Sequence, residues 1–290
     1  QSTNPHTIHA INRNVNFDKL AGIVKQIKAG ENIHQHLDLI AGLPHEDYAS
    51  FGKSFNDVYG LEPEQLQLGF LKVLKGSMLH QKQKEYEIVY HDAAPYEVMT
   101  THMLPYADTL RLKYIEEMVE TYYNSGKFLN TLAYLVPLYE SPFAFYEALS
   151  QLWLAEGCQY KSLSKIGLCD VLWDFVQKNE KVDKIRFQWA MKFDIALHEK
   201  PKKLPQWLNV GGNGQEYERI TAKLVQKYIP SYLEAEKKIL IKNTYLDVFE
   251  DKAILLDYGH RDLLGNAEYL VIPMEEVNEL LNKLKDKLAE

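Results

Sequence analysis

The stretch Ile33-His34-Gln35-His36-Leu37-Asp38-Leu39-Ile40, followed by Ala41-Gly42-Leu43-Pro44, decides the fold of the first part of this 290-residue chain. A short apolar-rich run that ends in a Gly and Pro turn is typical of a β-strand. Alternation along the strand places on one face His34, His36, Asp38 and Ile40, and on the other Ile33, Leu37 and Leu39. The polar row therefore predicts hydrogen-bonding partners or a cavity beside one face.

Helical and extended segments alternate on either side of this strand. A helix is predicted over 17–29, between Asn16 and Gly30, and another begins at Asp47. A further extended run covers 65–73. Strand, helix and strand at this spacing indicate parallel βαβ units, which are connected right-handedly and normally buried on both faces.

From residue 85 onward the pattern changes from α/β to mainly helical. Two extended pieces, 87–91 and 96–100, are followed by helices predicted over 110–123, 129–139, 143–156, 168–177, 184–197 and 215–228. A small antiparallel β-sheet is predicted from 244–249, 253–258 and 268–272, with a closing helix over 274–288. The predicted domains are 1–95, of α/β type, and 96–290, which is mainly α-helical.

Composition excludes several classes of protein. With 33 basic and 40 acidic side chains, the net charge of −7 lacks the cationic surplus that nucleic-acid binding needs. No run reaches the roughly 18 apolar residues of a membrane span, and no signal peptide is visible at the start. The two cysteines, Cys158 and Cys169, favour a reducing, cytoplasmic location and are interpreted as buried structural groups. Two thiolates are too few for an iron–sulfur cluster.

The polar face of the first strand is the first candidate site. His34, His36 and Asp38 could ligate Zn or Fe, because imidazole and carboxylate suit both metals. The alternative is that these groups line a cavity and are satisfied by their neighbours. In a parallel barrel, the turn at Gly42 would lie at the carboxyl end of the strand, where such folds place their sites.

Three further segments offer polar or main-chain groups. Gln1 and Ser2, with Arg13 twelve residues after Gln1, could hold ribose hydroxyls and a carboxylate. Main chain within 69–76 could contact a purine edge, although Leu71 and its apolar neighbours are also typical core residues. The segment 258–262 is predicted to be a hairpin turn, with a polar contact loop as the alternative.

Taken in order, these segments resemble the second half of a radical S-adenosylmethionine barrel, a TIM-like fold. The resemblance covers roughly residues 1–80 and is closest to oxygen-independent coproporphyrinogen oxidases and cobalamin-dependent relatives, some described as magnesium-protoporphyrin monomethyl ester oxidative cyclases. It rests on Gln1-Ser2-Thr3-Asn4-Pro5, Ala10-Ile11-Asn12-Arg13, 36–44 and 66–77. Residues from Tyr90 onward resemble the helical domain that follows the barrel in that group. The chain is therefore expected to be a C-terminal fragment of a radical iron–sulfur enzyme.

The resemblance implies roles for individual residues. Gln1 and Asp38 would meet the ribose hydroxyls of S-adenosylmethionine, with Ser2 beside them, and Arg13 would meet the methionine carboxylate. The adenine side would be formed by Ile40, Gly42 and the main chain around Leu71 and Lys72. One departure is the acidic residue after the turn, which is Glu46, one place late, with His45 in the expected position.

The other departures limit what this chain is expected to do. The three-cysteine motif for the [4Fe-4S] cluster, the first three strands and any cobalamin-binding segment are absent from the sequence. The full-length enzyme would use the reduced cluster to cleave S-adenosylmethionine to a 5′-deoxyadenosyl radical, acting as an oxidoreductase or transferase on a small-molecule substrate. This chain alone is expected to be inactive and to bind S-adenosylmethionine weakly at best. Its expected partners are the N-terminal half of the barrel and a cobalamin-type domain. The open sheet edge and an apolar inner face are expected to be covered by the helical domain or by a second copy of the chain.

Two other readings of the sequence stay open. The chain could be a metal-dependent barrel hydrolase that uses His34, His36 and Asp38. The helical region could instead be a protein-interaction or substrate-docking module, because it is rich in tyrosines at helical spacing, although such tyrosines are more often core. These tyrosines are Tyr106, Tyr114, Tyr122, Tyr123, Tyr134 and Tyr139.

Overall fold

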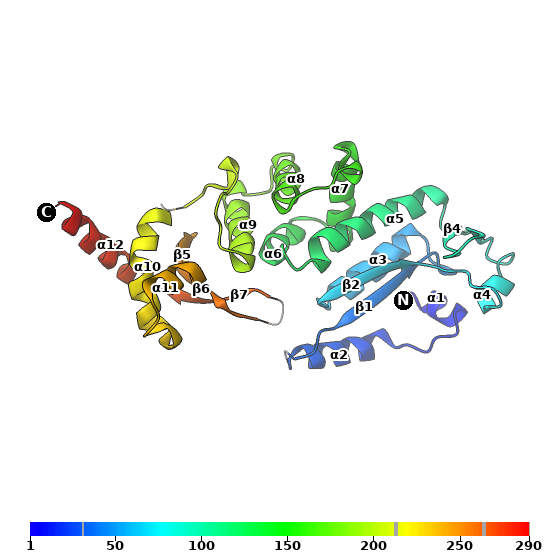
Figure 1. Ribbon diagram of the computed structural model, residues 1–290. Helices are drawn as coiled ribbons and strands as arrows, with labels where there is room; N and C mark the ends of the chain where they lie inside the picture. The colour runs from blue at the N-terminus through cyan, green and yellow to red at the C-terminus, as the bar shows by residue number, and fades with distance from the viewer. Residues whose placement is uncertain (31, 212–213, 263–264, 290) are drawn as a thin grey trace. The chain divides into compact units, whose positions relative to one another are not determined.

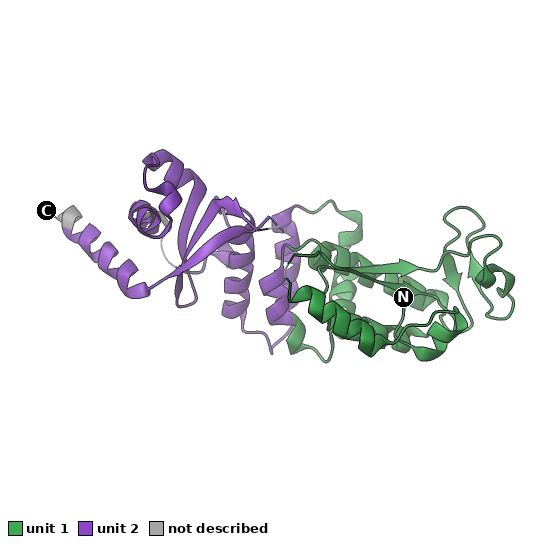
Figure 2. Ribbon diagram, turned by 90° about the horizontal axis from the view of Figure 1, so that it is seen from below, with its two compact units in different colours: residues 1–126, 136–163 green, residues 127–135, 164–290 purple. Residues whose placement is uncertain are grey.

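The computed structural model describes residues 1–30, 32–211, 214–262 and 265–289. The chain forms two compact units: unit 1 comprises 1–126 and 136–163, and unit 2 comprises 127–135 and 164–290 (Figure 2). The division therefore falls at other places than the predicted boundary between residues 95 and 96. The predicted boundary separates domains defined by the family resemblance, whereas the two units are defined by contacts within the structure. The predicted boundary therefore stays a prediction.

Unit 1 combines a short parallel sheet with helices (Figure 1). Its elements are α1 (Pro5–Ala10), α2 (Phe17–Lys28), β1 (His36–Ala41), α3 (Tyr48–Tyr59), β2 (Gln65–Phe70), α4 (Met78–Gln81), β3 (Val89–Tyr90), β4 (Val98–Thr100), α5 (Tyr106–Met118), the π-helix η1 (Val119–Asn124), the 3-10 helix η2 (Val136–Leu138), α7 (Pro142–Ala155) and the 3-10 helix η3 (Cys158–Tyr160).

Unit 2 contains helices and a three-stranded antiparallel sheet. Its elements are α6 (Leu129–Leu135), α8 (Lys165–Gln177), α9 (Lys184–His198), the 3-10 helix η4 (Gln206–Leu208), α10 (Gly214–Tyr228), the 3-10 helix η5 (Pro230–Tyr232), α11 (Lys237–Asn243), β5 (Thr244–Phe249), β6 (Lys252–Arg261), β7 (Ala267–Ile272) and α12 (Met274–Ala289). None of the helices in the described part of the chain is both long enough and apolar enough to cross a bilayer.

The parallel pair β1 and β2 confirms the predicted strand, helix and strand arrangement. Asp38 lies opposite Gln67, and Leu39 lies opposite Leu68. The apolar face carries Leu39, Leu66 and Leu68, all at least 96% buried. The connecting helix α3 packs against β1 and against α7. Burial of these side chains on one face is the main favourable term that holds the pair together.

A barrel, whole or partial, is not shown: β1 and β2 form a two-stranded sheet. The outer edge of β2 is closed by a side chain, because Asn124 accepts from the Leu66 amide at 2.9 Å and donates to its carbonyl at 3.0 Å. After β2 the chain turns back, and β4 lies antiparallel beside the residues that follow β2. Among the described residues, the sheet therefore lacks the next parallel strand that a barrel needs.

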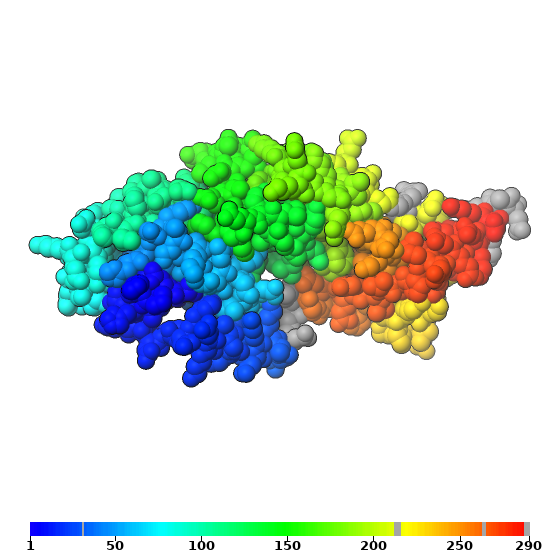
Figure 3. Space-filling model, turned by 180° about the vertical axis from the view of Figure 1, so that it is seen from behind, coloured from blue at the N-terminus to red at the C-terminus, as the bar shows by residue number. Residues whose placement is uncertain are grey.

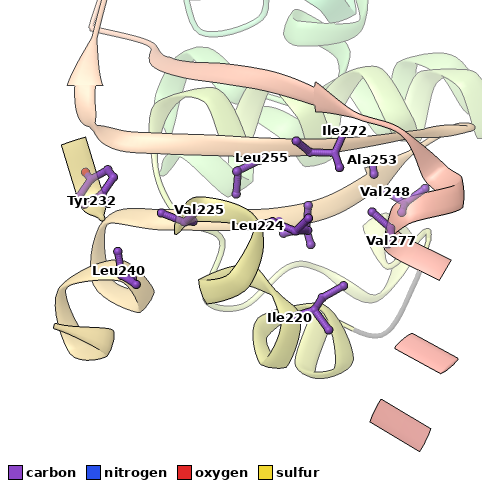
Figure 4. Close-up of a cluster of buried hydrophobic side chains, with 11 residues drawn as sticks. Ile220, Leu224, Val225, Tyr232, Leu240, Val248, Ala253, Leu255, Ile272 and Val277 are labelled. Atoms are coloured by element: carbon purple, nitrogen blue, oxygen red, sulfur yellow. The ribbon is translucent and has the colours of Figure 1, made fainter. Parts of the chain in front are cut away.

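The predicted antiparallel sheet in unit 2 is confirmed, with strand order β5, β6, β7. Alternate residues of β6 enter two different cores. Ala253 and Leu255 pack with α10, α11 and α12 on one face (Figure 4). Ile254 and Leu256 pack on the other face with Ala196 and Leu197 of α9. The sheet is thus covered on both faces along β6, whereas Tyr269, Leu270 and Val271 of β7 are 48%, 41% and 57% exposed.

The prediction of a hairpin turn at 258–262 is wrong. Strand β6 continues through Arg261, and the pairing with β7 shifts register between Asp257 and Arg261. At this bulge Gly259 lies under Tyr232, whose hydroxyl oxygen would be 2.2 Å from an added Cβ. The glycine that indicated a turn is therefore required by close packing within an irregular strand.

Candidate functional site

The candidate site lies at the carboxyl end of β1, where the chain turns through Ala41, Gly42, Leu43 and Pro44. All four residues are buried. The carbonyl of Ala41 accepts from the Leu71 amide at 2.9 Å, and the carbonyl of Pro44 accepts from the hydroxyl of Thr7 at 2.8 Å. These bonds tie the turn to α1 and to the segment after β2, so it is a fixed part of unit 1.

Gly42 has a φ of +85°, and an added Cβ would lie 2.7 Å from Cγ1 of Val98. We expect Gly42→Ala to lower the free energy of unfolding by about 1–3 kcal/mol, because it combines left-handed strain with overpacking. Urea denaturation measures this change. The matched control is Gly22→Ala on α2, where a Cβ meets nothing within 4 Å and stability should rise by about 0.5–1 kcal/mol. A Gly42→Ala protein as stable as the parent would contradict the expectation.

Behind the turn, a buried carboxylate joins the N-terminal segment to α3. Glu46 is 1% exposed, and its Oε1 accepts from Ser2 at 2.6 Å and from Ser54 at 2.9 Å. Its Oε2 has no hydrogen-bond partner among the residues that the structure describes. Burial raises the pKa of Glu46 above its usual value, while the two hydroxyl bonds oppose that rise. Figure 3 shows the N-terminal residues at the surface of unit 1 beside the segment that holds α3.

The face of the sheet that carries Asp38 is open and polar. Exposed side chains on it are His36, Asp38 and Gln67, with Ile40 half-buried. An exposed apolar inner face was expected here, and the open face of the sheet is polar instead. Exposed apolar side chains occur on other elements of unit 1, among them Leu20 of α2, which is 37% exposed, and Val89 of β3, which is 53% exposed.

Gln1 lies beside this open face. Its carbonyl accepts from the amide of Ile40 at 2.9 Å. Its amino group interacts electrostatically with Asp38, Glu46 and Arg13, and burial lowers the pKa of that amine. The structure therefore brings together Gln1, Asp38, Ile40 and Arg13.

The remaining predicted binding residues are placed differently. The Ser2 hydroxyl donates its hydrogen bond to the Glu46 carboxylate. Leu71 is buried and uses both main-chain groups within the protein, because its carbonyl accepts from Val98 at 2.8 Å. Lys72 is exposed, and its main chain forms an isolated antiparallel β-bridge with Glu97. The glycine at position 42 is explained by the close approach of Val98, without a ligand.

The possible metal ligands do not form a metal centre. His36 Nε2 lies 3.2 Å from His34 Nδ1, so the two imidazoles contact each other. Within the described ranges, no three His, Cys, Asp or Glu side chains are grouped so that they could hold a metal ion. The arrangement gives no support to a hydrolase that uses His34, His36 and Asp38.

Both cysteines are buried, as predicted. Cys158 belongs to unit 1 and Cys169 to unit 2. Burial raises the pKa of the Cys169 thiol to about 12, so it is protonated at neutral pH and a poor metal ligand. The cysteines of this chain do not fit an iron–sulfur cluster.

Most tyrosines that could have formed a docking surface are used inside the fold. Tyr122 is fully buried. Tyr134 donates from its hydroxyl to the carbonyl of Asp183 at 3.2 Å, and the Tyr123 hydroxyl donates to the carbonyl of Pro63 at 2.5 Å. Tyr106 is 49% exposed. These positions do not place the tyrosines together in one continuous aromatic surface.

Two adjoining cavities open beside the turn, and sequence reasoning did not find them. An apolar one of about 240 Å³ is lined by Gly42, Pro44, His45, Glu85, Tyr86, Ile88, Thr101, His102 and Met103. A polar one of about 310 Å³ is lined by His6, His9, Ala10, Asn12, His45, Lys82 and Tyr86. The available signal was the His6 and His9 pair, three residues apart and therefore on one side of a helical turn.

Comparison with known proteins adds a family. Residues 84–271, more than half of the chain, match the family described as "Protein of unknown function (DUF4080)". The chain belongs to this family. The matched region runs from the residues before β3 to the end of the three-stranded sheet, so β1, β2 and the turn at Gly42 lie outside it. No curated protein matches the chain.

Proposed function

We propose that residues 1–95 form part of the S-adenosylmethionine site of a radical enzyme, as the C-terminal part of its barrel. The observation that supports this most is the open polar face of the β1 and β2 pair, with Gln1 held against β1. A parallel pair with helix α3 on its apolar face is half of a layered α/β unit, and its other face normally meets more protein or a ligand. Here that face carries exposed Asp38 and Gln67.

The side chains near Gln1 suit a nucleoside with a charged tail. The Asp38 carboxylate can accept two hydrogen bonds from ribose hydroxyls, and the Arg13 guanidinium can form a bidentate pair with a carboxylate. Both lie near the Gln1 amino group and are exposed. Ile40 is half-buried beside them and can cover one side of the adenine. These residues fit S-adenosylmethionine better than Ser2 and the Leu71 main chain, which have partners within the protein.

The proposal assigns the iron–sulfur cluster and any cobalamin to other parts of the enzyme. A reduced cluster would supply the electron for the radical reaction, and the cysteines of this chain do not fit one. The proposed partner is a further segment that pairs with the outer edge of β1 and contributes the cluster ligands. This chain by itself is proposed to be inactive and to retain a weak part of the binding site.

Titration of the whole chain with S-adenosylmethionine tests this proposal. We expect dissociation constants in the range of about 0.1–1 mM, since about half of the contacts would be present. The amide chemical shift of Ile40 should move in NMR spectra, and Asp38→Asn should weaken binding about tenfold or more through loss of charged acceptors. The matched control is Asp18→Asn, which changes an exposed acid on α2.

Three outcomes would contradict the proposal. One is micromolar affinity, which would mean that the site is already complete. Another is the absence of a shift at Ile40 with several millimolar ligand. The last is equal binding by the Asp38→Asn and Asp18→Asn proteins.

A further inference from the structure

We infer that the two adjoining cavities form a binding site for a small organic anion with an apolar body. The anionic group, a carboxylate or a phosphate monoester, would enter the polar cavity, and the apolar body would enter the other. The site is distinct from the Asp38 face, and it does not require S-adenosylmethionine. His45 and Tyr86 line both cavities and join them into one site.

The polar cavity has the chemistry of an anion site. Its lining contains three imidazoles, one ammonium group, one amide and one phenol, and the nearest carboxylate is that of Glu85, which pairs with Lys82 and lines the adjoining cavity. This predominance of donor groups is unusual in a protein with 40 acidic and 33 basic side chains. His6 and His9 come from α1, His45 from the turn after β1, and Lys82 from the residue after α4. Donors that converge from three segments favour an anion over a cation.

Lys82 is available for an incoming anion. Its Nζ lies 3.4 Å from Glu85, and the two side chains are 43% and 55% exposed. An exposed pair of this kind contributes little to stability. Lys82 can therefore exchange Glu85 for a ligand at low cost.

The second cavity suits an apolar body. Tyr86, Ile88, Met103 and Pro44 provide apolar lining, and Ile88 belongs to a buried cluster with Leu43, Leu71, Val73 and Val98. Small-molecule sites in proteins are mostly apolar with a few placed polar groups, and their volumes begin at about 300 Å³. The two cavities of about 240 Å³ and 310 Å³ together reach that range.

The residue between the cavities is held in a strained conformation. His45 has a φ of +62°, which costs a non-glycine residue of the order of 1 kcal/mol. Its carbonyl accepts from Asn4 Nδ2 at 2.9 Å, and its ring meets the Tyr86 ring edge-on with 5.6 Å between centroids. A glycine would adopt this backbone without strain. The histidine therefore stands at position 45 in spite of the conformational cost, and its imidazole is what a glycine would lack. Strained residues of this kind cluster at ligand sites.

Titration with octanoate and octyl phosphate tests the inference, with acetate and octylamine as probes that lack one half of the ligand. We expect at least one of the two anions to bind at submillimolar concentration and to shift the amide signals of His45 and Tyr86. Acetate and octylamine should bind at least about tenfold more weakly, because each lacks either the apolar body or the anion. The ratio between octanoate and octyl phosphate distinguishes a carboxylate site from a phosphate site.

Variants assign the effect to named side chains. Lys82→Gln and His45→Gly should each weaken binding about five- to tenfold through loss of a charge-assisted or polar contact. The glycine keeps the backbone conformation at position 45, so loss of binding by His45→Gly cannot be attributed to misfolding if its melting temperature is retained. The matched control is Lys84→Gln, an exposed lysine outside both linings.

The inference would be overturned if neither anion bound, if octylamine bound as well as octanoate, or if Lys82→Gln and Lys84→Gln behaved alike. Asp38→Asn separates this site from the proposed S-adenosylmethionine site, because it should leave anion binding unchanged. Loss of anion binding in that variant would also overturn the inference of a distinct site.

Discussion

Asp247→Ala is expected to lower the free energy of unfolding of unit 2 by about 3–5 kcal/mol, the cost of leaving a buried charge without its partner. Lys192 and Asp247 form an ion pair at 2.7 Å, with side chains only 5% and 2% exposed. Lys192 also donates to the carbonyl of Val210 at 2.9 Å, and Asp247 accepts from Tyr245 at 2.5 Å. Removal of the carboxylate leaves the ammonium with the Val210 carbonyl but without its counter-charge, and leaves the phenol without its acceptor.

Urea denaturation followed by tryptophan fluorescence measures this loss, because Lys192 lies 5.4 Å from the centre of the Trp189 ring. The double variant Lys192→Met with Asp247→Leu should recover most of the stability, since a buried ion pair can be replaced by apolar residues. The matched control is Glu279→Ala in the exposed Lys283 and Glu279 pair, where both side chains are 64% exposed and the loss should be below about 1 kcal/mol. Equal losses in Asp247→Ala and Glu279→Ala would refute the expectation.

The second large effect concerns Asp194, a 2% exposed residue of α9 that holds the start of α6. Its carboxylate accepts from the main-chain amides of Asn130 at 3.0 Å and Thr131 at 2.8 Å, and from Asn130 Nδ2 at 2.8 Å. Asp194→Ala should cost about 3 kcal/mol, because buried donors at the start of a helix lose their acceptor. Asp194→Asn should cost about 1–2 kcal/mol, since its single acceptor oxygen can keep part of these bonds.

The same residue predicts a pH dependence of stability. Burial raises the pKa of Asp194 from 3.8 to about 6, and the bonds from Asn130 and Thr131 oppose that rise. The folded state therefore binds the proton more tightly than the unfolded state between these values. The resulting stability is fully present below pH 3.8 and is lost as pH rises through about 6.

Unfolding of the parent and Asp194→Asn proteins should be compared between pH 7 and pH 4. Relative to the variant, the parent should gain up to about 3 kcal/mol as pH falls, from a shift of roughly two pKa units. A stability difference that stays constant over this range, or that moves in the opposite direction, would rule out titration of Asp194 in this window.

Local patterns predicted the elements that depend on neighbouring residues. The strand ending at Gly42 and Pro44, the helix after Asp47 and the small antiparallel sheet near the end are all present. Alternation along 36–40 correctly placed His36, Asp38 and Ile40 on one face, because successive strand residues point to opposite sides. The turn predicted at 258–262 failed because Gly259 and its polar neighbours carry the same signal in a bulge as in a hairpin.

The surroundings of the candidate site residues were predictable only in part. Gln1 and Asp38 lie close together because the Gln1 carbonyl accepts from the amide of Ile40, two residues after Asp38 on β1. Ser2 was assigned to a ligand, yet its hydroxyl binds Glu46, and that choice depends on how α3 packs behind the turn. Tyr86 and Lys82 lie about forty residues after the turn at Gly42, and no local pattern links them to His45.

The sequence by itself therefore determined the order and type of most elements, the polar and apolar faces of β1, and the buried state of both cysteines. These properties follow from spacing, because periodicity and burial are local consequences of side-chain chemistry. Only the tertiary structure decided that the edge of β2 is closed by Asn124, that Gly42 is required by Val98, and that His6, His45 and Lys82 surround one cavity. Each depends on the approach of segments far apart in the chain, which is set by packing and loop closure rather than by any one stretch of residues.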